Sequence, residues 1–314
     1  MNISREYMNR LEALNHGPLK NEPAVKPQAE EIARRIRRKV GREDAIVAAS
    51  ELQARPRAAD VEKPALVETI PLNPVALEDV VAGVEVEVPG AGTAYLVEQR
   101  LPGVDEQIIC LERTLAPGTY RPESKLGSAL RALAPDYQVR PGDLLFMDIE
   151  TTGLSCASPL FLIGTLQCRE DSLLVRQFLA RDYSEEPCVN ALFAESLARA
   201  GMLVTFNGKS FDMPYITARA AANGVEIAVD TPHLDLLPVS RKQWRGHLPN
   251  CKLQTLEFHV CGRQRTGDIP GSLIPEAYHR FVRTSDASQM APIMEHNALD
   301  LLTMVDLVCH LGRK

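Results

Sequence analysis

The pattern of apolar and polar residues changes character at about residue 140. From Pro141 onward, three apolar stretches favour β-strands: GDLLFMDIETT, LFLIGTLQC and SLLVRQFLAR. The pattern next predicts a helix near 185–200, the strand MLVTFNG and a helix that begins close to Asp212. Later helices are predicted near 253–260, 274–283 and 290–311. This order predicts an α/β domain over 141–314, with a mixed sheet and helices on its faces.

Two segments of different character precede this domain. Residues 71–140 alternate apolar and polar positions in VEVEVPGAGTAYLVEQRLP and EQIICLERTL, with PGAG as a turn signal, which predicts a small β-hairpin or β-meander. Residues 1–70 are polar and rich in Glu, Arg, Ala and Pro, so we predict a partly helical or flexible arm. The arginine-rich run EIARRIRRKVGRED in this arm either contacts phosphates or forms a solvated helix.

Composition and charge narrow the class of protein. The 314 residues are 45% hydrophobic and 24% charged, which is ordinary for a soluble globular protein. A net charge of -6 argues against a general nucleic-acid coat protein, but it is compatible with a nuclease whose carboxylates cluster around metal ions. The seven Cys form no CxxC pair, and no apolar run approaches the roughly 18 residues of a membrane span. We therefore expect reduced thiols and a soluble, cytoplasmic protein.

The strongest chemical signal is a pair of carboxylates in the strand LLFMDIE, which is otherwise apolar at almost every position. Asp148 and Glu150 are two residues apart, so both point to one face of the strand, about 6.6 Å apart along it. Two buried like charges are unfavourable without a counter-charge, so bound Mg²⁺ or Mn²⁺ is the simplest explanation. The alternative is a pair at a strand end facing water, held by the hydroxyls of Thr151 or Thr152.

A second signal follows the strand MLVTFNG. The chain turns at Asn-Gly and places Asp212 near the start of a helix, where it is either a simple N-cap or part of a site. Asn207 and Lys209 lie at a strand end, where α/β proteins bind ligands, and the Lys209 ammonium suits a phosphate.

A third signal lies in the helix near 290–311. His296 and Asp300 are four residues apart, so they share one helical face within an apolar surrounding. They form either a His–Asp pair in the core or part of a metal site. Taken together, the three segments supply four carboxylates and a base, which is the set that a two-metal site for in-line phosphoryl transfer needs.

These segments resemble a known family. MDIETTGL, TFNGKSFDMPYI and EHNALDLLTM resemble the three exonuclease motifs of the DEDD superfamily, which has the ribonuclease H-like fold. HLDLLP, LPNCKLQTLEFHVCG and GDIPGSLIPEAYHRFVRTSDAS are similar to the YprB-like subgroup of predicted exonucleases. The resemblance covers roughly 142–311 and implies a 3′-5′ exonuclease that hydrolyses phosphodiester bonds of single-stranded DNA or RNA with two Mg²⁺ or Mn²⁺ ions.

The resemblance also implies roles for individual residues. The metal ligands that it implies are Asp148, Glu150, Asp212 and Asp300. It makes His296 the general base that activates water, a role that a neutral imidazole with a pKa near 6.5 suits. The candidate substrate-binding residues are Thr151, Thr152, Asn207 and Lys209. Asp235, in HLDLL, either adds a carboxylate to the cleft or lies in a surface loop.

One spacing departs from the family pattern. In the His subclass the base precedes the last Asp by five residues and in the Tyr subclass a tyrosine precedes it by four, whereas His296 precedes Asp300 by four. Two other functions stay open on the sequence. One is a non-catalytic nucleic-acid-binding protein on the same fold, and the other is a structure-specific endonuclease with the same metal chemistry.

Overall fold

A computed structural model describes most of the chain after residue 72. The described ranges are 73–101, 105–116, 124–134, 139–169, 172–228 and 230–312. The arm predicted over 1–70, with its arginine-rich run, lies outside them. None of the helices in these ranges has the length and apolar character that a membrane crossing requires.

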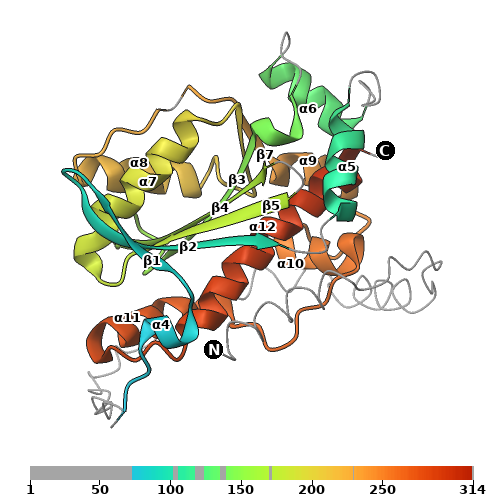
Figure 1. The fold of residues 1–314 in the computed structure, drawn as a ribbon. Coiled ribbons are helices and arrows are strands. Elements are labelled where there is room, and N and C mark those ends of the chain that lie inside the picture. Colours follow the sequence, from blue (N-terminus) through green and yellow to red (C-terminus); the bar gives the residue numbers. More distant parts are fainter. Residues whose placement is uncertain are drawn as a thin grey trace, which may run out of the picture. The chain divides into compact units, whose positions relative to one another are not determined.

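Seven strands form one mixed sheet in the described ranges, in the order β1-β2-β5-β4-β3-β6-β7 (Figure 1). The strands are β1 (Val84–Val88), β2 (Gly92–Leu101), β3 (Leu144–Thr151), β4 (Leu160–Arg169), β5 (Ser172–Leu179), β6 (Met202–Thr205) and β7 (His233–Asp235). Neighbours from β1 to β3 pair antiparallel, whereas β6 pairs parallel with β3 and β7 parallel with β6. The predicted α/β class with a mixed sheet is confirmed.

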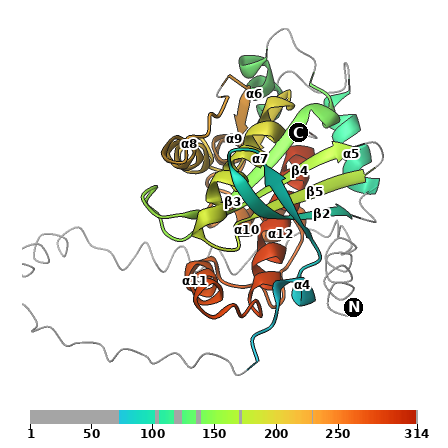
Figure 2. The same ribbon diagram turned by 60° about the vertical axis from the view of Figure 1, so that its left-hand side comes forward.

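Helices cover both faces of this sheet (Figures 1 and 2). The helices are α4 (Leu77–Val80), α5 (Asp105–Leu115), α6 (Lys125–Leu133), α7 (Glu186–Ala198), α8 (Asp212–Ala222), α9 (Leu236–Trp244), α10 (Leu253–Leu256), α11 (Ile274–Thr284) and α12 (Met290–Gly312). Short 3₁₀ turns are η2 (Pro141–Asp143), η3 (Tyr183–Glu185) and η5 (Gly271–Leu273), and η4 (Glu257–Cys261) is a π-turn. One hydrophobic core joins α5, α6, α9 and most of α12 to the sheet, and a second joins α7, α8 and α11.

The alternation of β3 decides which core each side chain meets. Phe146 packs in the core that contains most of α12, whereas Met147 and Ile149 pack in the core of α7 and α8. Because side chains two residues apart share a face, Asp148 and Glu150 follow Phe146 toward α12. The sequence pattern of β3 therefore directs both carboxylates at the helix that carries the third motif.

The segment before residue 140 differs in part from the prediction. The hairpin is confirmed as β1 and β2, and β2 pairs with β5, so the sheet continues across residue 140. EQIICLERTL was predicted to continue the β-structure, and this is wrong, because it lies in α5. Its apolar residues Ile108, Leu111 and Leu115 recur at helical spacing and are all buried. Neither β7 nor α9 was predicted.

Candidate active site

Acidic side chains from three distant segments gather on the α12 face of the sheet. Asp148 and Glu150 come from β3, Asp212 is the first residue of α8, and Asp300 lies on α12. They are close enough for the negative charges of Asp300, Glu150 and Asp212 each to raise the pKa of Asp148. The arrangement places the acids of all three predicted motifs in one region.

Burial is the main cause of raised pKa values in this group. It raises the pKa of Asp148 well above its usual range, with the neighbouring acids adding to the effect. Burial likewise raises the pKa of Glu150 to about 8, although the positive charge of His296 opposes the shift. The pKa of Asp212 rises to about 7, first through burial and then through Asp235 and Asp300. Carboxyl groups in such surroundings lose their protons more readily when a cation joins them.

A buried amide links α12 to β3. Asn297 Nδ2 donates to Asp148 Oδ2 at 2.9 Å, and Gln177 Nε2 donates to Asn297 Oδ1 at 2.9 Å and to the Met294 carbonyl at 2.8 Å. Asp148, Gly164 and Gln177 are direct neighbours across β3, β4 and β5. A Cβ atom on Gly164 would lie 1.9 Å from Asn297 Oδ1, so only glycine leaves room for this amide.

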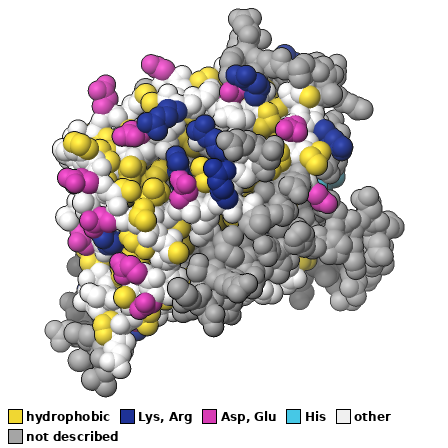
Figure 3. All heavy atoms as spheres, viewed as in Figure 1, with side chains coloured by type: hydrophobic (Ala, Val, Ile, Leu, Met, Phe, Trp, Pro, Cys, Tyr) yellow, Lys and Arg dark blue, Asp and Glu magenta, His cyan; other side chains and the backbone are white. Residues whose placement is uncertain are grey.

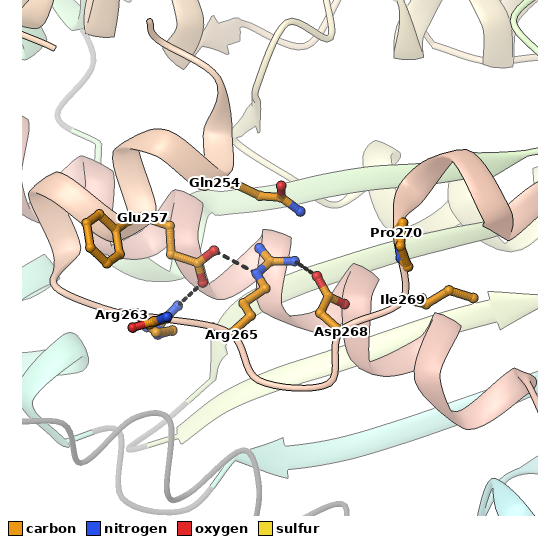
Figure 4. Close-up of a pocket in the computed structure, with 9 residues that line it drawn as sticks. Gln254, Glu257, Arg263, Arg265, Asp268, Ile269 and Pro270 are labelled. Carbon is orange, nitrogen blue, oxygen red and sulfur yellow. Dashed lines mark hydrogen bonds and ion pairs between the residues drawn. The ribbon is translucent and has the colours of Figure 1, made fainter. Parts of the chain in front are cut away.

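The fourth acid, Asp300, has a different environment. Arg265 Nη2 donates to Asp300 Oδ1, and His296 Nε2 lies 3.8 Å from Asp300 Oδ2. Arg265 also pairs with Glu257 (Nε–Oε2, 2.6 Å) and with Asp268 (Nη1–Oδ2, 3.2 Å), as Figure 4 shows. Asp268 in turn bonds His296 Nδ1 at 2.9 Å. Sequence reasoning missed this set, although a short stretch with two Arg and one Asp, RQRTGD, runs up to the segment that resembles the subgroup.

The environment of His296 differs from the one expected for a neutral base. Burial lowers the pKa of His296, but the hydrogen bond to Asp268 and the negative charges of Asp300 and Glu150 outweigh it and raise the pKa to about 9. The imidazole is therefore protonated near pH 7 as long as these acids carry their charge. The predicted shared face of His296 and Asp300 is confirmed by their contact.

The turn between β6 and α8 is held by Asp235. This carboxylate accepts from the backbone N–H groups of Asn207 at 2.8 Å, Lys209 at 3.2 Å and Leu237 at 3.0 Å. Asp235 is buried and caps α9, so it does not lie in a surface loop. The side chains of Asn207 and Lys209 are exposed at this turn. Asp212 is inside α8, and the N-cap position belongs to a neighbour, so it is not a simple N-cap.

The two threonines after β3 shape the loop that follows. Thr151 Oγ1 donates to the Gly153 carbonyl at 2.8 Å, and Thr152 Oγ1 donates to the Pro159 carbonyl at 3.0 Å. Their hydroxyls are thus bonded to backbone oxygens rather than to the two carboxylates of β3. Leu154, in the same loop, is 90% exposed, which makes it a prominent apolar side chain beside the acids.

The donor set suits a hard divalent cation in its chemistry, since it consists of buried carboxylate oxygens. Within the described ranges, no Lys or Arg forms an ion pair with Asp148, Glu150 or Asp212. In the same ranges, no three His, Cys, Asp or Glu side chains already surround a single point as ligands. The acids share a region, and Asp300 is turned to Arg265.

Charge is unevenly distributed over the molecular surface. On the face in Figure 3, Lys and Arg side chains gather near the upper middle, whereas Asp and Glu side chains lie mainly toward the left edge. The overall negative charge therefore coexists with a locally basic area.

The fold and the acids on β3 and α12 define the class: a ribonuclease H-like α/β domain. A sequence profile of the RNase_H superfamily, RNase_H_2, matches residues 145–312. Because this match covers more than half of the chain, the protein belongs to the RNase_H superfamily. The resemblance seen in the sequence is confirmed at this level.

Two further proteins are similar to this chain. The uncharacterized protein YprB of Bacillus subtilis (strain 168) is 31% identical over 178 residues, which are 55% of this chain and 42% of YprB. The chain thus matches less than half the length of that relative. The family B DNA polymerase from the hyperthermophilic archaeon Pyrobaculum calidifontis is 18% identical, with a TM-score of 0.44 over 52% of this chain and 24% of the polymerase.

Proposed function

We propose that this protein is a metal-dependent nuclease that hydrolyses phosphodiester bonds, as a 3′-5′ exonuclease on single-stranded DNA or RNA. The observation that carries the proposal is the convergence of four acids from β3, α8 and α12 on one face of the sheet. Three of them have pKa values raised by burial and by each other's charge, so a divalent cation relieves their repulsion. Membership of the RNase_H superfamily supports the same chemistry.

The acids would hold the ions, and the neighbouring residues would hold the acids. Asp148, Glu150, Asp212 and Asp300 are the proposed ligands of Mg²⁺ or Mn²⁺, with two ions expected. When bound, such ions supply Lewis-acid stabilisation of the charge that develops on the phosphate. Asn297 keeps the Asp148 carboxylate oriented through its 2.9 Å hydrogen bond.

His296 is the proposed general base. Asp268 bonds its Nδ1 atom, so Nε2 is the atom directed at Asp300 and the acids. With the remaining proton on Nδ1, Nε2 can accept a proton from the attacking water. Cations that offset the charges of Glu150 and Asp300 remove two of the causes that raise the His296 pKa, and so favour the neutral imidazole.

The substrate would lie along the end of β6 and the loop after β3. Lys209 is exposed at that strand end, where its ammonium group can contact a phosphate. Asn207 is beside it, and its backbone φ of 69° shows a left-handed turn that directs the chain toward α8. Thr151 and Thr152 shape the opposite loop and are the proposed contacts on that side.

The test is a cleavage assay on matched DNA and RNA oligonucleotides that carry a 5′ label. We expect the wild-type protein to shorten single strands with Mn²⁺ and to stop in EDTA. Asp148→Asn should lower the rate by at least about 100-fold, because loss of a ligand exceeds loss of an outer-shell contact. Asp230→Asn is the matched control, since Asp230 is exposed and outside the acid group. Equal rates for wild type and Asp148→Asn would exclude the proposal.

The product pattern separates an exonuclease from an endonuclease. Stepwise shortening from the 3′ end gives a ladder of 5′-labelled products, whereas a structure-specific endonuclease gives discrete internal cuts.

A non-catalytic nucleic-acid-binding role is the second candidate function. The ion pair between Arg265 and Asp300 favours it, because this pair already gives one acid a cationic partner without a metal ion. Binding of oligonucleotides in EDTA, together with no cleavage at any metal concentration, would establish this role.

A further inference from the structure

Arg265 is a buried cation inside the acid group. Its side chain is 7% exposed, and it pairs with Glu257, Asp268 and Asp300. Each contact uses a different nitrogen: Nε meets Glu257, Nη1 meets Asp268 and Nη2 meets Asp300. A guanidinium held by two other carboxylates keeps its positive charge directed at the third.

This contact makes the four acids unequal. Asp300 has Arg265 at Oδ1 and His296 near Oδ2, whereas Asp148 has the neutral amide of Asn297. Neither Asp148, Glu150 nor Asp212 has a Lys or Arg partner in the part of the chain that the structure describes. A divalent ion near Asp300 therefore meets a positive charge that an ion near the other three acids does not.

We infer that Arg265 makes the two ion positions of the site unequal. An ion held by Asp148, Glu150 and Asp212 binds first, and an ion that uses Asp300 binds in competition with the Arg265 guanidinium. Two cations repel strongly at contact distance in a buried site, so Arg265 weakens the second position. This inference rests on the proposed function, since it requires the acids to bind divalent ions.

The surroundings of Arg265 allow competition rather than a permanent block. Release of Asp300 breaks one of its three ion pairs, and Glu257 and Asp268 still hold the side chain. Arg265 also lines a cleft of about 380 Å³ beside Gln254 and Phe258, visible in Figure 4, which gives the guanidinium room to shift. Arg265 thus has a second place to go when an ion occupies Asp300.

Calorimetric titration of the full chain with Mn²⁺ tests the inference. We expect two binding steps in the wild-type protein, the second at least about tenfold weaker than the first, and a second step at least about tenfold tighter in Arg265→Met. Arg263→Met is the matched control, because Arg263 is also buried and pairs with Glu257 and Asp306 but not with Asp300. A second step that is no tighter in Arg265→Met than in wild type would overturn the inference.

Two further measurements keep the outcomes separate. If Mn²⁺ binding is lost in Asp148→Asn while Arg265→Met changes nothing, only the inference fails; if Mn²⁺ binding does not depend on Asp148, the proposed function fails as well. Arg265→Met leaves Glu257 with Arg263 and Asp268 with His296, so the fold should persist. Should it unfold, ¹⁵N NMR of the Arg265 side chain in wild type replaces it. A shift during the second step of a Mg²⁺ titration supports competition, and an unchanged signal contradicts it.

Discussion

Asn297, on α12, donates a 2.9 Å hydrogen bond to the carboxylate of Asp148, on β3. It lies between His296 and Asp300 in sequence, so the bond ties the third motif to the first. Gln177 orients the amide, and Gly164 leaves the space for it. The relative position of the acids therefore depends on neutral residues that have no role in the proposed chemistry.

Asn297→Ala should weaken Mn²⁺ binding by about 10- to 100-fold, because it removes the group that orients a proposed ligand. Calorimetry measures this effect. The control is Asn190→Ala, another fully buried asparagine on α7, which should change stability but leave Mn²⁺ affinity as it is. Unchanged affinity in Asn297→Ala would show that the amide serves the fold alone.

Gly164→Ala should destabilise the protein by about 1–3 kcal/mol, because the added Cβ overlaps the Asn297 side chain in a packed region. Displacement of Asn297 should also weaken Mn²⁺ binding. Gly142→Ala is the comparison, since a Cβ there would meet its nearest neighbour, the Cys168 carbonyl, at 3.6 Å. Urea unfolding of both variants measures the difference, and equal midpoints would contradict the expectation.

The stability of the metal-free protein should fall as pH rises from about 5 to 9. The folded-state pKa values of Glu150, about 8, and Asp212, about 7, lie above their usual values of 4.5 and 3.8, so the folded protein holds protons that the unfolded chain has released. His296, raised from 6.5 to about 9, acts in the same direction, since its stabilising charge is lost as pH passes the folded pKa.

Urea unfolding in EDTA at several pH values measures this slope. Saturating Mg²⁺ should reduce it, because bound cations favour the ionised acids, and Glu150→Gln should flatten it in the absence of metal. A stability that rises between pH 5 and 9 in EDTA would contradict the raised pKa values of this site.

Asp235→Ala should destabilise the protein by about 1–3 kcal/mol, because three backbone N–H groups lose their acceptor. The turn that presents Lys209 should loosen, so oligonucleotide affinity should fall as well. Fluorescence anisotropy and thermal unfolding measure the two effects, with the exposed Asp230→Ala as control. A variant that is less stable but binds with full affinity would place Asp235 in the fold only.

Local periodicity predicted those parts of the site that lie within one element. Alternation along β3 places Asp148 and Glu150 on the same face, and a spacing of four places His296 beside Asp300 on α12. Periodicity was misleading in EQIICLERTL, where alternation and helical spacing overlap in a short stretch, and burial of Ile108, Leu111 and Leu115 decided for α5.

The sequence alone thus determined the fold class, the family resemblance and the elements that carry the acids. Only the tertiary structure decided which side chains meet: Arg265 with Asp300, 35 residues apart, Asp235 with the turn at Asn207, 28 apart, and Asn297 with Asp148, 149 apart. The physical reason is that periodicity reports a residue's face within its own helix or strand. The partner across a face depends on how the sheet and helices pack, which no single stretch of sequence encodes.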